Sequence, residues 1–327
     1  MKNTLLFILK SLVRALSLLV AVSIVAFILV TVSPINPLQA NVGQTALGSM
    51  SAEQIEKLEE YYGVNTPPLE RYLNWAGDFI RGDMGTSLVY RQSVAEVISQ
   101  RLNNSLWLLI FAWAASGLIG FALGVSSGTR ADKPLDKGIR SFALITASTP
   151  PFWLALILLM VFSVWLQWFP VGLSVPIGLA AGEVSFADRL AHAVLPALAL
   201  SLSGIASVTL HTREKTFAVM ESDYVLFAAA RGESRRSIIL RHGLRNVAIP
   251  ALTLQFASVG EIIGSSVLVE QVFSYPGLGQ AAVAAGLNGD VPLLLGISLI
   301  CAALVIGGNF IANVLHGVID PRIRRSQ

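Results

Sequence analysis

Charged residues are scarce in this 327-residue chain. Asp, Glu, Lys and Arg make up 13% of it, whereas a soluble globular domain carries roughly 25%. Hydrophobic residues make up 54%, and the mean hydropathy is +0.66. This shortage of charge argues against a soluble protein and indicates that lipid is the solvent for much of the chain.

Residues that bind metals, form disulfides or hold nucleotides are also few. The single Cys301 lies in an apolar run, which excludes a disulfide framework, and the four histidines are too scattered for a local metal site. No G-x-x-x-x-G-K-[ST] phosphate-binding loop occurs. We therefore expect no catalytic residue, no cofactor and no metal, and no ATP hydrolysis by this chain.

Basic residues slightly exceed acidic ones, which gives a net charge of +3. They fall between apolar segments and do not gather on one face or tail, so nucleic acid is not an expected partner. Their positions instead predict membrane topology.

Long apolar stretches predict an all-α integral membrane protein with six transmembrane helices. They are about Ala15–Val32, Leu102–Ser127, Ile139–Trp165, Leu195–Leu210, Ala251–Val272 and Leu293–Leu315. The fourth is the weakest, because Pro196 and Gly204 interrupt it, although membrane helices tolerate such residues. The first has a basic start like a signal peptide, but it is longer than a typical signal core, so we expect it to stay as an anchor.

The distribution of Lys and Arg predicts the orientation. With six spans, 17 of the 23 basic residues lie at the termini and in the loops after the second and fourth spans, and six lie on the opposite side. Because cytoplasmic segments carry the excess of Lys and Arg, both termini are expected in the cytoplasm.

The external segment 33–101 is predicted to form a small extracytoplasmic subdomain between the first span (1–32) and the remaining membrane domain (102–327). Ser51 and Gln54 have the spacing of a capping box before a helix over Ala52–Tyr62, which Gly63 would end. A solvated linker and a docking surface are both consistent with this segment.

The cytoplasmic segment 224–250 is predicted to form a helical hairpin. Ala228, Ala229 and Ala230 favour a helix, which Gly232 would break. Ser234 can cap a second short helix over Arg235–His242, which Gly243 and Pro250 would end. A basic amphipathic segment of this kind can also simply lie against anionic lipid.

These residues resemble the cytoplasmic coupling loop of ATP-driven importer permeases of the peptide, nickel and opine class. The matching residues are Tyr224, Ala228, Ala230, Gly232, His242, Leu244, Arg245, Asn246 and Pro250. Leu226 occupies the place of an acidic residue in the broader motif. Three more stretches resemble the same class in the right order, namely Gly82–Leu88, Glu270–Gly279 and Asp320–Arg324.

The resemblance implies the permease subunit of a binding-protein-dependent importer in a bacterial inner membrane, with the hairpin docking on an ATPase. Implied partners are a second permease, two ATPase subunits and an extracytoplasmic solute-binding protein. Di- or oligopeptides are the implied cargo, with nickel chelates or opines as alternatives. A secondary transporter would need related inverted halves. An intramembrane hydrolase would need Ser203 and His211 to meet, although they lie eight residues apart on one helix.

Polar and small residues within the spans suggest further roles. Gly120, Gly124 and Gly128 recur every four residues, as do Gly260 and Gly264, which favours close helix packing. Glu261 shares its span with Gln255, Ser258, Ser265 and Ser266, and a buried carboxylate there costs about 2.5–3.5 kcal/mol unless it faces a cavity or a partner. These polar side chains are consistent with a solute pathway or with a contact to the second permease. Candidate gating or packing residues at the external end are Glu270, Pro276, Gly277 and Gly279, with Glu270 alternatively a solvated interfacial carboxylate.

Overall fold

A computed structural model describes residues 2–32, 48, 50–61, 66–176, 178 and 184–319. The chain divides into two compact units. Unit 1 comprises Met1–Val13, Leu106–Tyr275 and Gly307–Gln327, and unit 2 comprises Arg14–Ser105 and Pro276–Ile306. Each unit is described by itself.

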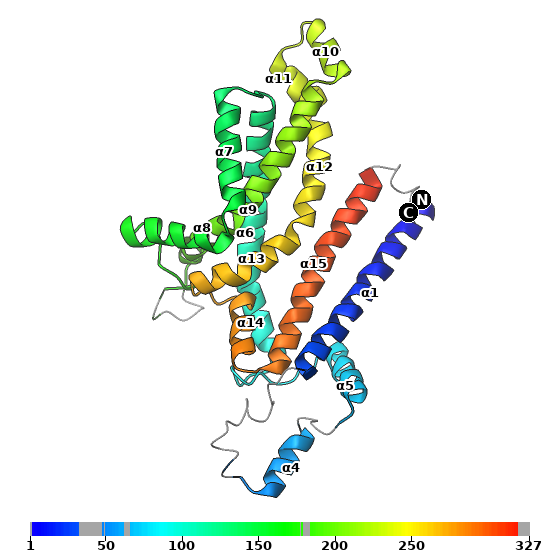
Figure 1. The fold of residues 1–327 in the computed structure, drawn as a ribbon, viewed down its shortest axis with the longest axis vertical. Coiled ribbons are helices and arrows are strands. Elements are labelled where there is room, and N and C mark those ends of the chain that lie inside the picture. Colours follow the sequence, from blue (N-terminus) through cyan, green and yellow to red (C-terminus); the bar gives the residue numbers. More distant parts are fainter. Residues whose placement is uncertain are drawn as a thin grey trace. The chain divides into compact units, whose positions relative to one another are not determined.

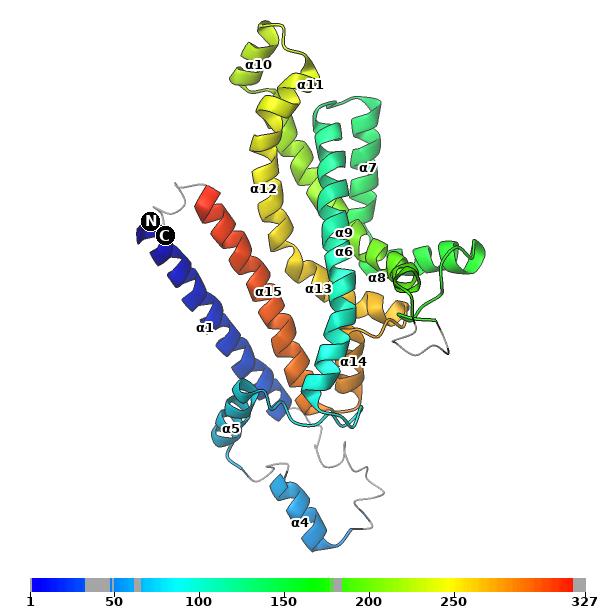
Figure 2. The same ribbon diagram turned by 180° about the vertical axis from the view of Figure 1, so that it is seen from behind.

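Helices account for nearly all regular structure in the described residues, as Figures 1 and 2 show. Their bounds are α1 (Lys2–Val32), α4 (Ala52–Tyr61), α5 (Pro68–Arg81), α6 (Val94–Gly128), α7 (Pro134–Ser148), α8 (Pro151–Leu158), η1 (Leu159–Trp165), α9 (Phe186–Met220), α10 (Asp223–Ala230), α11 (Arg235–Ile238), η2 (Ile239–Gly243), α12 (Leu244–Ala257), α13 (Val259–Val272), α14 (Leu278–Leu287) and α15 (Val291–Ile319). Within these ranges the only β pairing is an isolated bridge between Thr86 and Ser93. The predicted all-α class is confirmed.

Among the described residues, four single helices are long and apolar enough to cross a membrane. They lie within α1, α6, α9 and α15. Two further pairs of helices pass the same test together but are bent, namely α7 with α8–η1 and α11–α12 with α13. The expected six spans are reached when each bent pair counts as one span.

The third expected span is not one straight helix, which corrects the sequence interpretation. α7 ends at Ser148, and the following helical segment, α8 with η1, runs at 107° to it. Thr149 is extended, with φ −101° and ψ 126°. A residue before proline avoids the helical region, and Pro150 and Pro151 then begin the next helix, so two adjacent prolines explain the break.

The fourth expected span, by contrast, is one continuous helix. α9 runs from Phe186 to Met220 through Pro196, and 67% of its most apolar window is buried. Pro196 and Gly204 are both buried in unit 1. Packing against neighbouring helices therefore outweighs the local weakness that the proline and glycine introduce.

The glycines of α6 let this helix approach α9 closely. A Cβ on Gly120 would lie 2.8 Å from Cβ of Val208, one on Gly124 would lie 2.5 Å from Cβ of Thr212, and one on Gly128 would lie 2.6 Å from Cβ of Thr216. Real Cβ atoms do not approach so closely. The predicted packing role of this glycine series is confirmed.

Gly264 behaves differently. A Cβ there would meet no atom of the described chain within 4 Å, so its small size is not required by packing among these residues.

Unit 2 has its own apolar cluster where α6 begins beside α14 and α15. Val94, Val97 and Ile98 pack there against Leu278 and Leu293. In the same unit the predicted capping box is confirmed, since Ser51 N donates to Gln54 Oε1 (3.0 Å) and Gln54 N donates to Ser51 Oγ (3.3 Å). The expected stop at Gly63 lies outside the described residues.

The Gly124→Val substitution tests the α6–α9 contact. The added side chain must displace α9, which is expected to destabilise the protein by about 1–3 kcal/mol, the usual cost of overpacking. The measurement is the midpoint of thermal unfolding in detergent. Gly138→Val is the matched control, because Gly138 is an exposed helical glycine of α7 whose Cβ would meet nothing within 4 Å among the described residues. Equal midpoints for the two variants would contradict the contact.

Candidate functional site

The candidate site that is expected to be cytoplasmic is a hairpin whose turn requires glycine. α10 ends at Ala230, and Gly232 has φ +84°. Gly232 N donates to Ala229 O (3.0 Å) and Glu233 N donates to Ala228 O (3.2 Å), which closes the helix end. Because side chains strain this backbone conformation, the expectation that Gly232 ends the first helix is confirmed with a physical reason.

The second arm of the hairpin begins as predicted and ends differently. Ser234 Oγ accepts a hydrogen bond from Ser237 N (3.3 Å), which confirms the cap. Gly243 has ordinary helical angles, and Pro250 lies inside α12. The expected stops at Gly243 and Pro250 are therefore wrong, since the helical path through α11, η2 and α12 is unbroken from Arg235 to Ala257.

Proline removes one backbone donor from α12, and the wider π turn of η2 lies in the same helical path. Neither feature ends a helix that packs against α9. The hairpin is thus joined directly to the fifth expected span (Figure 1).

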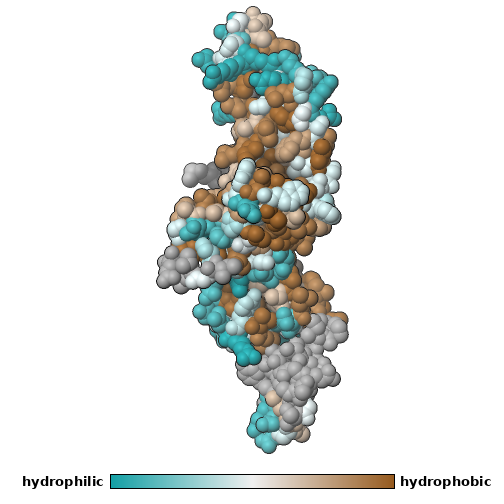
Figure 3. Space-filling view, turned by 90° about the vertical axis from the view of Figure 1, so that its left-hand side faces the viewer, coloured by the Kyte–Doolittle hydropathy of each residue, from teal (hydrophilic) through white to brown (hydrophobic). Residues whose placement is uncertain are grey.

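The hairpin has a small core and an exposed apolar face. Val225, Ala228 and Ile238 are buried together. Leu226 and Phe227 are 58% and 66% exposed. Figure 3 shows hydrophilic residues gathered around the end of unit 1 that carries α10 and α11, with apolar residues among them. An exposed apolar pair beside a polar rim is typical of a protein-binding surface.

Polar contacts tie the two arms together. Asn246 Nδ2 donates to the Tyr224 hydroxyl (3.0 Å) and to His242 O (3.2 Å). His242 Nε2 lies 3.3 Å from Glu233 Oε2, which also accepts from Ser237 Oγ (3.4 Å). The structure thus brings Tyr224, His242 and Asn246 to one place.

The remaining predicted hairpin residues take other positions. Ala228 is in the hairpin core, whereas Ala230 and Arg245 are exposed. Glu233, which contacts Ser237 and His242, was not predicted as a site residue. Its position directly after Gly232, at the turn, could have indicated it.

A buried ion pair at the base of this region was also missed. Arg213 Nε and Nη2 donate to the two carboxylate oxygens of Asp136 (both 2.7 Å). The same carboxylate accepts from Ser127 Oγ and from Asp132 N (2.9 Å). The Asp136 side chain is 2% exposed and that of Arg213 is 18% exposed. This bidentate pair joins the ends of α6 and α7 to α9, and only the fold brings its members together.

The polar residues of the fifth expected span separate into two environments. Glu261 is exposed and accepts a hydrogen bond from Ser203 Oγ (3.2 Å). Gln255 is 4% exposed and donates from Nε2 to Trp113 O (2.6 Å). Ser258 marks the 47° bend between them, and its Oγ donates to Gln255 O (2.8 Å). Ser265 is half-buried.

The end of this span that is expected to be external is a tight turn in unit 1. Glu270 is fully buried, so its interpretation as a solvated carboxylate is wrong. Tyr275 N donates to Glu270 O (2.8 Å), and Ser274 between them has φ +48°. Burial raises the pKa of the Tyr275 hydroxyl to about 12, with the Glu270 carboxylate adding to the shift and Arg189 opposing it.

The rest of the external turn belongs to unit 2 and is held by α6. Asn104 Nδ2 donates to Pro276 O (2.9 Å), and Leu278 N donates to Ser105 Oγ (2.7 Å). Gly277 is the extended cap of α14, and Gly279 is buried in its first turn. These contacts hold the residues on either side of Gly277.

The stretch Gly82–Leu88 is organised by a carboxylate that was not predicted from the sequence. Asp290 Oδ2 accepts from Ser87 Oγ (2.6 Å), Leu88 N (2.9 Å) and Val89 N (3.1 Å). Its Oδ1 accepts from Leu293 N at the start of α15 (3.2 Å). The fourth stretch, Asp320–Arg324, lies outside the described residues.

The contacts of the two residues expected for a hydrolase site do not support that site. Ser203 Oγ donates a hydrogen bond to Glu261 Oε1, and His211 is exposed further along α9. Among the described residues, no group of three or more His, Cys, Asp or Glu is placed to hold a metal ion.

Comparison with known proteins agrees with the arrangement of membrane helices and hairpin. Residues 120–325 match the family of binding-protein-dependent transport system inner membrane components. The chain belongs to this family. It is therefore a multi-pass transport component of an inner membrane, and the secondary transporter and the hydrolase are set aside.

Individual relatives cover almost the whole chain. The oligopeptide transport system permease protein AppB of Bacillus subtilis is 34% identical over 97% of this chain and 98% of its own length. A putative peptide permease protein of Brucella suis is 32% identical with the same coverage. A probable peptide ABC transporter permease protein of Sinorhizobium fredii is 31% identical over 97% of this chain and 99% of its own length.

The Asp136→Asn substitution tests the buried ion pair. It leaves the Arg213 guanidinium without its ionic partner, which is expected to destabilise the protein by about 3–5 kcal/mol, as for other broken buried pairs. Thermal unfolding in detergent measures the effect. Asp78→Asn is the control, because the Asp78–Arg81 pair is largely exposed on both sides, so its loss should change little. Similar midpoints for both variants would show that the buried pair is not a stabilising clamp.

Proposed function

We propose that this chain forms half of the translocation pathway of an ATP-driven, binding-protein-dependent importer for di- or oligopeptides. The printed names of the relatives support peptides as the cargo. Nickel chelates and opines are the alternative cargoes, since the same sequence motifs serve them. The structural observation that carries the proposal is the exposed hairpin joined through one unbroken helical path to the fifth expected span.

The proposed assembly contains this chain, a second homologous permease, two ATPase subunits and an extracytoplasmic solute-binding protein in a lipid bilayer. This chain is the non-catalytic membrane subunit, because its sequence has no phosphate-binding loop. ATP hydrolysis takes place in the separate subunits. This chain is proposed to bind no cofactor, metal or nucleic acid.

The hairpin is the proposed coupling element. α10 presents Leu226 and Phe227, which are suited to a cleft on an ATPase subunit. The turn at Gly232 and the Asn246–Tyr224 hydrogen bond fix α10 against the helix that follows. Movement of α10 by its partner is thereby passed to α12.

Beyond the bend at Ser258, α13 carries the proposed pathway residue Glu261. Its exposure in a span and its contact with Ser203 support this role. Ser265 and Ser258 are proposed to line the same route, with Gln255 behind them against α6. Glu270, Pro276, Gly277 and Gly279 are proposed to hold the external end of the route.

The proposed organisation keeps three segments. These are the first span and its leading residues (1–32), an extracytoplasmic subdomain (33–101) and the permease domain (102–327) with its coupling loop (224–250). Both termini are cytoplasmic in this arrangement.

Reporter fusions test the orientation. A reporter joined after Gly128 or Gly243 is expected to give a cytoplasmic signal, and one joined after Ser87 an external signal, because Lys and Arg are concentrated on the side of the first two positions. Alkaline phosphatase and green fluorescent protein fusions at each position provide paired readouts. An external signal at Gly243 would overturn the proposed topology.

Gly232→Val tests the coupling function. Valine at φ +84° strains the turn by about 1–3 kcal/mol and re-aims α10. We expect the chain to reach the membrane, ATPase co-purification to weaken and uptake to be lost. Gly178→Val is the matched control, because Gly178 has φ +90° and, like Gly232, would place its Cβ at least 4 Å from the described chain.

In a separate measurement, the purified chain alone should hydrolyse no ATP.

The lipid-contact alternative makes the opposite prediction. If the hairpin only lies on anionic lipid, neutralising Arg235, Arg236 and Arg241 should matter more than the turn, since surface attachment depends on basic charge. Normal uptake by Gly232→Val would show that the hairpin is not the coupling element.

A further inference from the structure

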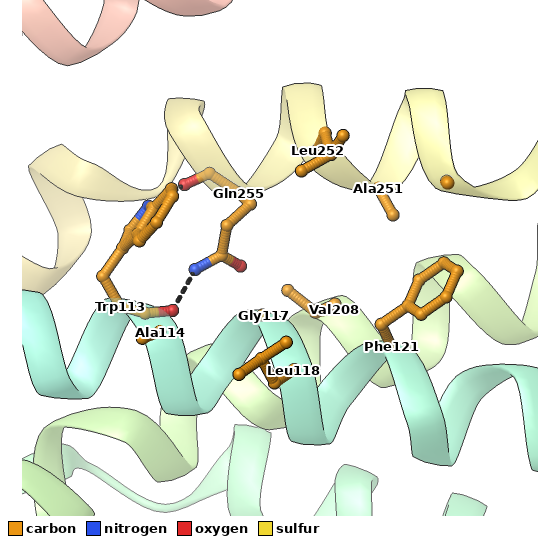
Figure 4. A pocket seen from close by; sticks show the side chains of 10 residues that line it. Trp113, Ala114, Gly117, Leu118, Phe121, Val208, Ala251, Leu252 and Gln255 are labelled. Carbon is orange, nitrogen blue, oxygen red and sulfur yellow. Dashed lines mark hydrogen bonds between the residues drawn. The ribbon is translucent and has the colours of Figure 1, made fainter.

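Unit 1 contains an apolar pocket of about 390 Å³ between α6, α9 and α12. Figure 4 shows Leu118 from α6, Val208 from α9 and Ala251 from α12 around it, with Trp113 and Gln255 at one end. The pocket lies beside α12, between the hairpin and the bend at Ser258. Gln255, which is proposed to lie behind the pathway residues, lines this pocket, and the other lining residues belong to none of the proposed coupling or pathway sites.

The closed end of the pocket is a reciprocal pair of hydrogen bonds. Trp113 Nε1 donates to Gln255 O (2.9 Å), and Gln255 Nε2 donates to Trp113 O (2.6 Å). The second hydrogen of that amide is directed to Ser116 Oγ (2.9 Å). Both donors of the Gln255 side chain are therefore satisfied.

The acceptor of the same amide is not satisfied. Gln255 Oε1 is buried and has no hydrogen-bond partner among the described residues. An unpaired buried acceptor is destabilising, because it has lost its hydrogen bonds to water. In Figure 4 the amide nitrogen is turned toward Trp113, and the oxygen is turned the other way, to the side of the pocket where Val208 lies.

The chemistry of the pocket restricts its occupant. A buried water needs two to four polar partners, whereas the lining residues carry one unpaired polar side-chain atom, the buried Gln255 Oε1. An ion would have no counter-charge in the lining. A mostly apolar, uncharged molecule with one O–H or N–H donor matches both the walls and the unpaired oxygen.

We propose that this pocket binds an uncharged amphiphile that carries a single hydrogen-bond donor, entering from the hydrocarbon region of the membrane. Leu118 and Leu252 at its rim are 74% and 50% exposed, so the entrance is apolar. The last torsion of glutamine is broad, so the amide can turn to present Oε1 to an incoming hydroxyl, which lengthens its hydrogen bonds to Trp113 O and Ser116 Oγ. The inference goes beyond the proposed function and does not depend on it.

Photolabelling of the purified full chain with 3-azioctanol tests the proposal. Mass spectrometry is expected to place the label on peptides of α6 and α12 that line the pocket. n-Octanol should compete about tenfold better than n-octane, because one neutral hydrogen bond contributes about that factor. Equal competition by the alkane would overturn the role of Gln255 Oε1.

Matched variants separate pocket binding from general partitioning. Ala251→Phe fills the pocket and should remove the label from these peptides. Ala122→Phe adds the same side chain at an exposed position of α6 outside the pocket and should leave labelling unchanged. If Ala251→Phe does not fold, as judged by thermal unfolding, Ala251→Leu replaces it. Undiminished labelling of a folded Ala251 variant would overturn the proposal.

Discussion

The close approach of α6 and α9 is the contact on which unit 1 depends. Lipid offers apolar side chains no advantage over protein, so helices associate through close packing and polar contacts. The glycine face of α6 supplies the close packing, and the Asp136–Arg213 pair at the same end of α9 supplies a polar contact. α9 then leads directly into the hairpin, and α12 returns along it. The position of the hairpin is therefore set by a contact deep among the spans.

The sequence predicted those features that depend on one segment alone. Hydropathy located the apolar segments, and local turn chemistry located the capping box and the turn at Gly232. It failed where packing decides: a helix stop was expected at Pro250, but α12 passes through it. Asp136 with Arg213 and Asp290 with Ser87 are far apart along the chain, so no local pattern relates them. The break at Pro150–Pro151 was also missed, although two adjacent prolines are a local signal for it.

The hairpin, α12 and the bend at Ser258 follow one another along the chain, and the proposed coupling movement passes through them in that order. A helix that is unbroken from Arg235 to Ala257 transmits a displacement along its length, whereas a bend allows the next segment to change direction. Trp113 and Gln255 fasten α12 to α6 just before that bend. The apolar pocket beside α12 lies on the hairpin side of this pair of hydrogen bonds. Exposed Glu261 lies on the other side.

The glycine face of α6 also has a consequence for biogenesis. α6 precedes α9 in the chain and is synthesised first, and α7 and α8 are synthesised after α6 and before α9. During that interval the glycine face of α6, whose backbone is not shielded by Cβ atoms, is exposed in the bilayer before α9 is present. Such a face suits any helix with small side chains, including the same face on a neighbouring nascent copy. The timing of translocon release thus determines how long mispairing competes with the native contact.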